Sequence, residues 1–268
     1  MFVGWLRKDS LEKDLETLSN DILLDKSAIL KAFIENESFC YGIYDGGKLV
    51  AILSAIHLEK MILINTFAYL SNVSKTLRER LVSLFFKNIT RKETILFLAK
   101  SDEIDIFSNF GFTPYGNFLK ATYKGGAIFN FTNAMGKYIS NENYLHTIKQ
   151  VDFLAFDEDR LDYITKLSKQ SSLILSTKFG FQHSYAIDKA IIKISPWIMD
   201  VEAFDDAEKL LRGVIYHRGL KILIAFIPAD ISEIKELYEN YNFKFESGYK
   251  LLYKNEKPNI NMEMIYGF

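Results

Sequence analysis

Cysteine is almost absent from this sequence. Cys40 is the single one among 268 residues, so the chain cannot form an internal disulfide, and no second thiol can share a metal ion with it. Histidine is scarce as well: His57, His146, His183 and His217 lie far apart, without the HxxxH or HxH spacing of common metal sites. We therefore predict no metal site, and we expect Cys40 to be a small buried residue.

A dominant charge and long apolar runs are also missing. Lysine and arginine number 33 against 34 aspartates and glutamates, which leaves a net charge of -1. That balance gives no general attraction to nucleic acid or to an anionic membrane. The longest apolar runs, such as residues 222–228, are far shorter than the roughly 20 residues that cross a bilayer, and the first ten residues contain no signal-peptide core. We expect a cytoplasmic protein with neither nucleic acid nor membrane as a partner.

What the sequence does have is apolar residues in regular patterns. Hydrophobic residues make up 49% of the chain, enough for one large core or for two of about 100–150 residues each. The Asp45-Gly46-Gly47 segment between two extended runs is typical of a tight β-hairpin. In the first half, the patterns predict helices at 10–20, 25–37, 74–88 and 101–109, extended runs at 39–44, 49–56, 62–70 and 94–99, and a last extended pair ending at Tyr123.

The second half repeats this order of elements. Phe110-Gly111-Phe112 aligns with Tyr241-Asn242-Phe243 at an offset of 131 residues (241 minus 110), and the same offset superimposes helix on helix and strand on strand. Few identities survive, so a chance alignment of apolar patterns is the alternative. The glycine- and asparagine-rich segment 124–143 is the natural joint. We predict two domains, 1–126 and 127–268, that meet near residue 130.

Short motifs at the end of each half indicate a family. Residues 106–112 (IFSNFGF) and 237–243 (LYENYNF) both resemble the Leu-Tyr-Glu-Lys-x-Gly-Phe signature of the GNAT superfamily of N-acetyltransferases. Residues 156–160 (FDEDR) and 195–198 (SPWI) resemble the C-terminal unit of tandem GNAT proteins. The likeness covers nearly the whole chain. It implies an α/β fold with a mixed sheet, built from two GNAT-like acyl-CoA N-acyltransferase units in tandem.

The resemblance also implies where acetyl-CoA would bind. In the family, a loop of small residues between the fourth strand and the next helix holds the pyrophosphate through backbone N–H groups at a helix N-terminus. The first unit offers Ser71, Asn72, Ser74, Lys75 and Thr76 at this place, after the backbone of Phe67, Ala68, Tyr69 and Leu70.

This loop has none of the family's glycines, so an ordinary Ser/Thr-capped helix is the alternative. The second unit has Asp205-Asp206-Ala207-Glu208 at the matching place, where carboxylates would repel a phosphate. We therefore expect any cofactor in the first unit. Lys75, Arg78 and Arg80 could contact its phosphates or form a solvated helix face.

Catalytic residues are expected in the second unit. The family commonly uses a tyrosine on the last helix as general acid. The motif places this position at Phe107 in the first unit, whose side chain has no proton to donate, and at Tyr238 in the second unit. His183 is the one histidine that we consider as a base. Tyr238 as a core aromatic and His183 as an ordinary hydrogen-bonded histidine are the alternatives.

We therefore expect an N-acetyltransferase that transfers acetyl from acetyl-CoA to a small-molecule or peptide amine, in a monomer or homodimer. The competing hypothesis is a non-catalytic ligand-binding or scaffolding protein that has kept the fold, because fold alone does not fix function.

Overall fold

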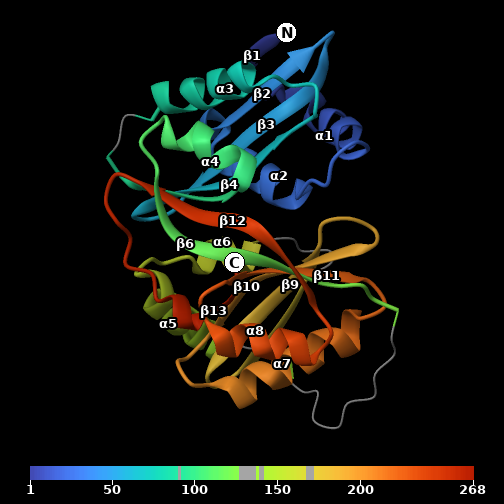
Figure 1. Cartoon of the computed structure of the whole chain (residues 1–268), viewed down its shortest axis with the longest axis vertical. Coiled ribbons are helices and arrows are strands. Elements are labelled where there is room, and N and C mark those ends of the chain that lie inside the picture. Colours follow the sequence, from blue (N-terminus) through green and yellow to red (C-terminus); the bar gives the residue numbers. More distant parts are fainter. Residues whose placement is uncertain (90–91, 127–136, 139–141, 167–171) are drawn as a thin grey trace. The chain divides into compact units, whose positions relative to one another are not determined.

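The computed structural model describes residues 1–89, 92–126, 137–138, 142–166 and 172–268 (Figure 1). The chain forms two compact units. Unit 1 consists of Met1–Tyr115 and Lys250–Lys257, and unit 2 of Gly116–Tyr249 and Pro258–Phe268. Most of the expected joint at 124–143, including residue 130, lies outside the described residues, and the boundary between 126 and 127 stays a prediction.

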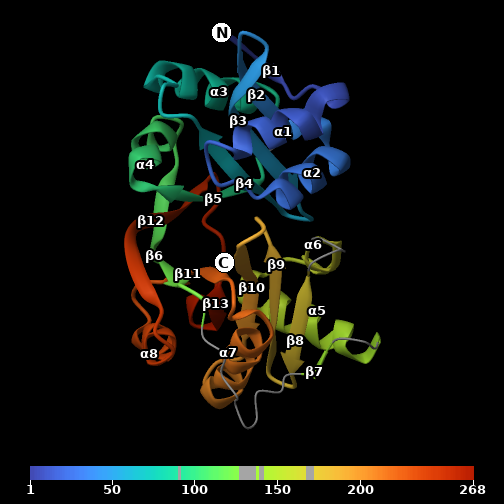
Figure 2. The same cartoon turned by 90° about the vertical axis from the view of Figure 1, so that its right-hand side faces the viewer.

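Unit 1 is a mixed sheet with helices on both faces. Its strands follow the order β1-β2-β3-β4-β5, after which residues 250–254 of β12 complete it. From β1 to β4, each strand runs antiparallel to the next, whereas β4 and β5 run parallel. Helices α1 and α2 cover one face, and α3 and α4 cover the other (Figure 2). The elements are β1 (Phe2–Trp5), α1 (Leu11–Ser19), α2 (Lys26–Glu35), β2 (Cys40–Asp45), β3 (Lys48–His57), β4 (Met61–Tyr69), α3 (Lys75–Lys87), β5 (Thr94–Lys100), α4 (Ser101–Ser108) and β12 (Lys244–Lys254).

The local signals in the sequence explain these boundaries. The side chain of Asp25 accepts a hydrogen bond from the N–H of Ala28 at the start of α2, and Ser74 does the same for Leu77 at the start of α3. Gly46, with φ of 54°, and Gly47, with φ of 84°, form the turn between β2 and β3, as a tight hairpin requires. The predicted elements are confirmed, except that the final extended pair is one continuous strand, β6 (Thr113–Tyr123).

Unit 2 has the same kind of mixed sheet. Its strand order is β6-β11-β10-β9-β8-β7, and β13 pairs with β10. Helices α7 and α8 pack on one face through Leu210, Leu211, Ile234 and Tyr238, and α5 contacts β9 and β10. Besides β6, the elements are β7 (Lys137–Tyr138), α5 (Glu142–Phe156), α6 (Leu161–Lys166), β8 (Leu173–Thr177), β9 (Gly180–Ala186), β10 (Ile191–Met199), α7 (Phe204–Arg218), β11 (Ile222–Pro228), α8 (Ser232–Asn240) and β13 (Ile265–Gly267).

The predicted repeat is visible in the hydrogen bonds. The N–H of Phe112 donates to the carbonyl of Phe107 at 3.2 Å, and 131 residues later the N–H of Phe243 donates to Tyr238 at 3.2 Å. Between them, Gly111 (φ 84°) and Asn242 (φ 63°) both have the left-handed backbone that ends a helix. Strands β6 and β12 then begin 131 residues apart and have 11 residues each. The two halves are therefore repeats of one structural unit.

Candidate functional sites

In unit 1, strands β4 and β5 separate at the end where the predicted cofactor loop begins. Their parallel pairing runs from Met61 and Thr94 to Ile64 and Phe97. At Asn65 the register with β3 shifts, so that this residue forms a bulge. Its side chain accepts a hydrogen bond from Ser54 Oγ at 2.8 Å and donates one to the carbonyl of Ala28 at 2.8 Å. Because a bulge bends its strand, the rest of β4 diverges from β5 and leaves a gap.

Aromatic side chains fill this gap. The ring of Phe107 lies 4.4 Å from that of Phe97 and 5.2 Å from that of Phe67, measured between centroids, and Phe107 is fully buried. Phe107 is the residue that the motif places where the family has its tyrosine. In this unit it is part of the core cluster with Phe112 and Leu81.

A polar cluster closes the mouth of the gap. The hydroxyl of Tyr69 donates to Asp102 Oδ2 at 2.6 Å, the guanidinium of Arg78 lies 4.4 Å above the Tyr69 ring, and Arg78 and Asp102 form an ion pair at 3.7 Å. Burial, followed by the hydrogen bond to Asp102, raises the pKa of Tyr69 above its usual range. Arg78 is thus turned toward the gap, whereas Lys75 and Arg80 are exposed.

Beside this cluster, Glu103 is a buried carboxyl group whose charge opposes folding. It is 3% exposed and accepts a hydrogen bond from the N–H of Lys100 at 2.8 Å. Burial raises its pKa from 4.5 to about 7. Because the folded pKa is the higher one, the contribution of Glu103 to stability is full below pH 4.5 and is lost as the pH rises through about 7.

We expect the change in the free energy of unfolding caused by Glu103→Gln to be roughly 2–3 kcal/mol more favourable at pH 8 than at pH 4.5, since one pKa unit corresponds to about 1.4 kcal/mol. Urea unfolding of both proteins at the two pH values measures the difference. Asp105→Asn, on the exposed side of the same helix, is the control and should show no such pH dependence. Equal shifts for the two variants would contradict the assignment.

Some backbone N–H groups in the predicted cofactor loop are already hydrogen-bonded, and others at the start of α3 are not. The N–H of Leu70 donates to Val50 and that of Val73 to Leu70, while Ser74 caps α3. Within the described part of the chain, the N–H groups of Lys75 and Thr76 have no acceptor, as expected for the first turn of a helix. A helix start with such donors is suited to an anion.

The matching gap in unit 2 contains a strand of the protein itself. Strands β10 and β11 pair from Ile191 to Lys193 and from Ile222 to Ile224. Beyond this, Trp197 and Ile198 of β10 pair with Gly267 and Ile265 of β13. On the other side, the N–H of Phe268 donates to the carbonyl of Phe226 in β11 at 2.9 Å. The segment 265–268 therefore lies between the two strands and occupies the opening.

Tyr238, the predicted general acid, is held by this same strand. It is fully buried, and its hydroxyl donates to the backbone carbonyl of Tyr266 at 2.7 Å. Its ring packs against Trp197 with centroids 5.6 Å apart. Burial raises its pKa well above the usual range, so the hydroxyl retains its proton. Proton transfer from Tyr238 would require β13 to move away, and the catalytic role stays a prediction.

His183, the predicted base, lies on the other face of the same sheet. Its neighbour Gln182 pairs with Trp197, whose ring packs against Tyr238 at a tilt, and side chains alternate along a strand. His183 is fully buried, with Nδ1 at 3.1 Å from the carbonyl oxygen of Ser195, and its ring stacks on Tyr185. The structure thus does not bring the two predicted catalytic side chains together within unit 2.

The start of α7 is acidic, in contrast to that of α3. A cavity of about 390 Å³ lies there, lined by Phe179 and by residues 200–206. Asp200, Glu202, Asp205 and Asp206 give it four carboxylates. Because these groups repel phosphate, this position in unit 2 is unsuited to a pyrophosphate.

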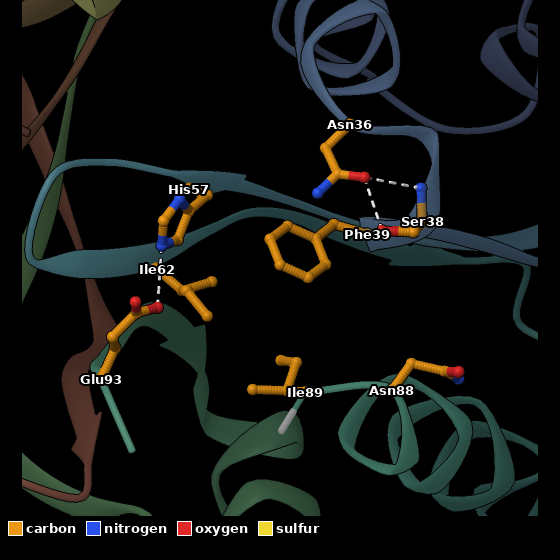
Figure 3. A pocket seen from close by; sticks show the side chains of 8 residues that line it. All are labelled: Asn36, Ser38, Phe39, His57, Ile62, Asn88, Ile89 and Glu93. Carbon is orange, nitrogen blue, oxygen red and sulfur yellow. Dashed lines mark hydrogen bonds and ion pairs between the residues drawn. The ribbon is translucent and has the colours of Figure 1, made fainter. Parts of the chain in front are cut away.

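One pocket was not predicted. It lies in unit 1 and contains the pair of His57 and Glu93, which are 36 positions apart in the sequence (Figure 3). No motif marked either residue. In the described part of the chain, no three His, Cys, Asp or Glu side chains gather as a metal site would require. Nor does any described helix have the length and apolar character needed to cross a bilayer.

Comparisons with known proteins identify the fold. No protein-family model matches the chain, and no curated protein matches it in sequence. The structure is similar to a proposed acetyltransferase from Pyrococcus horikoshii, with a TM-score of 0.80 and 15% identity over 100% of this chain and 93% of that one. A GCN5-related N-acetyltransferase from Sphaerobacter thermophilus has a TM-score of 0.63 and 10% identity, with 98% of both chains covered.

A third similar structure is a tandem GNAT protein from the clavulanic acid biosynthesis pathway. Its TM-score is 0.63 at 9% identity, over 96% of this chain and 99% of that one. These likenesses extend over both units and confirm the predicted fold class: a mixed α/β architecture of two GNAT-like units in tandem.

Proposed function

We propose that the protein is an acyl-CoA-dependent N-acetyltransferase with its cofactor in unit 1. The observation that carries this proposal is the start of α3, where the N–H groups of Lys75 and Thr76 have no acceptor among the described residues and lie beside two diverging strands. The similar solved structures are described as acetyltransferases, which supports the same class. When bound, acetyl-CoA would supply the acetyl group as a thioester.

In this proposal, the loop Ser71–Thr76 holds the diphosphate. Ser74 and Thr76 add hydroxyl groups to the backbone donors, and the exposed Lys75 adds a positive charge. The gap itself fits an extended pantetheine arm only if side chains move, because Phe67 and the Tyr69–Asp102 hydrogen bond now close it. The acceptor in this proposal is an amine, while Tyr238 as general acid and His183 as base stay predictions, because both are buried and lie on opposite faces of the unit 2 sheet.

A second candidate is supported by the closed gaps. Phe107 cannot donate a proton, and the hydroxyl of Tyr238 is bound to β13. A protein with these features could bind an acyl-CoA or a related ligand without transferring the acyl group. The two candidates differ in turnover but share the binding site at α3.

The test is a calorimetric titration with acetyl-CoA. We expect saturable binding to the unmodified protein and a loss of at least tenfold in affinity for Ser74→Glu and for Lys75→Glu, because a carboxylate at this helix start repels phosphate. Lys87→Glu, at the opposite end of α3 and also exposed, is the matched control and should bind normally.

Turnover separates the two candidates. Release of free thiol from acetyl-CoA that depends on an added amine supports the enzyme, whereas binding without thiol release over a panel of amines supports the ligand-binding protein. Absence of any heat of binding at high cofactor concentration would overturn both.

A further inference from the structure

Strand β1 is an open edge of the unit 1 sheet. It stands at the end of the strand order, and no strand of the described chain pairs with its outer side (Figure 1). The N–H of Leu6, directly after β1, donates to the carbonyl of Cys40 in β2 at 3.1 Å, as the register of the two strands requires. Because hydrogen-bonded and non-bonded pairs alternate in an antiparallel ladder, the N–H and C=O groups of Val3 and Trp5 then point away from β2. These groups can hydrogen-bond to a further strand.

The side chains on this edge are apolar and exposed. Met1, Phe2 and Trp5 are 55%, 59% and 60% exposed. Edge strands in other proteins usually carry charged residues or proline, which prevent pairing with another chain. Residues 1–6 (MFVGWL) contain no ionisable side chain and no proline. The edge is therefore suited to binding a strand, and a partner rich in charge would find no complement on it.

The pattern of β1 fits a second copy of itself. In a two-fold symmetric antiparallel pair, the outward-facing groups of one strand must meet the same groups of the other. A two-fold axis at Val3 satisfies this condition, because Val3 then lies opposite the partner's Val3, and Trp5 opposite the partner's Met1. Opposite side chains in such a pair share one face of the sheet. Each exposed Trp5 ring is thus covered by an exposed Met1 side chain.

Phe2 completes the fit on the other face of the sheet. Its ring lies over Gly4, since a Cβ atom added to Gly4 would be 2.6 Å from the ring. In the register with the axis at Val3, Phe2 lies opposite the partner's Gly4. The two Phe2 rings, each leaning along its strand toward the axis, then lie side by side, an arrangement that aromatic rings favour. All three exposed apolar side chains of the edge are therefore covered by the same pairing.

We propose that the protein forms a homodimer in which two β1 strands pair antiparallel and join the unit 1 sheets of the two copies. No like charges oppose each other in this pairing, because residues 1–6 have no ionisable side chain. Strand β1 has only four residues, so the pair buries less than the roughly 800 Å² per partner of a standard interface. The dimer is therefore reversible and depends on protein concentration. The proposal does not involve the acetyl-CoA site, and each can fail without the other.

The experiment is sedimentation velocity of the full chain from low concentration to the solubility limit, with tryptophan emission recorded on the same samples. We expect monomer at low concentration and dimer at high concentration, with a blue shift of the emission as the dimer forms. The chain has two tryptophans, and Trp197 is fully buried. The shift therefore reports on Trp5, and a dimer that forms without it uses another surface.

Phe2→Lys and Phe2→Glu should each weaken self-association at least tenfold, because each places like charges beside the axis. An equimolar mixture of the two variants should associate again, since lysine then faces glutamate; a folding defect would not be rescued in this way. Ile34→Lys, on α2 and 82% exposed, is the matched control and should dimerise as the unmodified protein does. The proposal is overturned if the unmodified chain stays monomeric at every concentration, if either Phe2 variant dimerises normally, or if their mixture fails to associate.

Discussion

Replacing Asp152 by alanine is expected to lower the free energy of unfolding by about 3–5 kcal/mol. Asp152 and Arg160 form a bidentate ion pair, with nitrogen–oxygen distances of 3.0 and 2.6 Å, and are 1% and 5% exposed. The guanidinium also lies 3.4 Å above the ring of Phe156. Without its partner, the Arg160 charge would remain buried and uncompensated, and urea unfolding measures the loss.

A second pair in the same region is the control. Lys149 and Asp159 form an ion pair whose side chains are 52% and 32% exposed. Because water screens such charges, Asp159→Asn should change stability by less than about 1 kcal/mol. The combined variant Asp152→Leu with Arg160→Met should regain most of the lost stability, since neither Asp152 nor Arg160 is then left as a buried charge without the other. If Asp152→Ala lowers the free energy of unfolding by less than about 1 kcal/mol, the Asp152–Arg160 pair is accessible to water.

This ion pair gives a structural meaning to one of the sequence motifs. Residues 156–160 resemble a tandem GNAT signature. In the structure, Phe156 supports the guanidinium of Arg160, Glu158 is fully buried, and Asp157 has a positive φ of 51°. The motif is thus a turn that joins α5 to α6 and buries Phe156, Glu158 and Arg160, and a motif alone could not have distinguished this role from a catalytic one.

The repeat could be predicted from sequence because it rests on local signals. Helix caps, the left-handed residues Gly111 and Asn242, and apolar spacing each depend on residues a few positions apart. The helix start at Ser74 and its free donors follow from the same local rules.

The contents of the gaps could not be predicted in this way. The pairing of Trp197 with Gly267 joins residues 70 positions apart, and β13 has only three residues, too few for a recognisable pattern. Nothing local to Tyr238 indicates that its hydroxyl binds Tyr266 rather than facing a substrate. The His57–Glu93 pair was missed for the same reason, because its two residues meet only through the fold.

Strand β13 contributes strongly to the stability of unit 2. Tyr266→Ala is expected to lower the free energy of unfolding of this unit by about 3–5 kcal/mol. Tyr266 is 1% exposed, and its ring packs against Trp197 at 5.4 Å and Phe204 at 6.4 Å. Removing the ring leaves a cavity between β13 and the core, which the backbone can close only by shifting the strand. Urea unfolding gives the loss, with Tyr216→Ala on α7 as the control, because that side chain is 56% exposed.

Hydrogen exchange locates the effect of Tyr266→Ala within unit 2. The N–H of Phe268 is bonded to Phe226, and the hydroxyl of Tyr238 to the carbonyl of Tyr266, so both bonds weaken if β13 loosens. We expect the Phe268 amide to exchange faster in the variant by a larger factor than amides in α7, since local opening then precedes global unfolding. Uniform acceleration throughout unit 2 would instead mean that β13 opens only when the whole unit unfolds. Tyr238 could then not be freed for proton transfer by a movement of β13 alone.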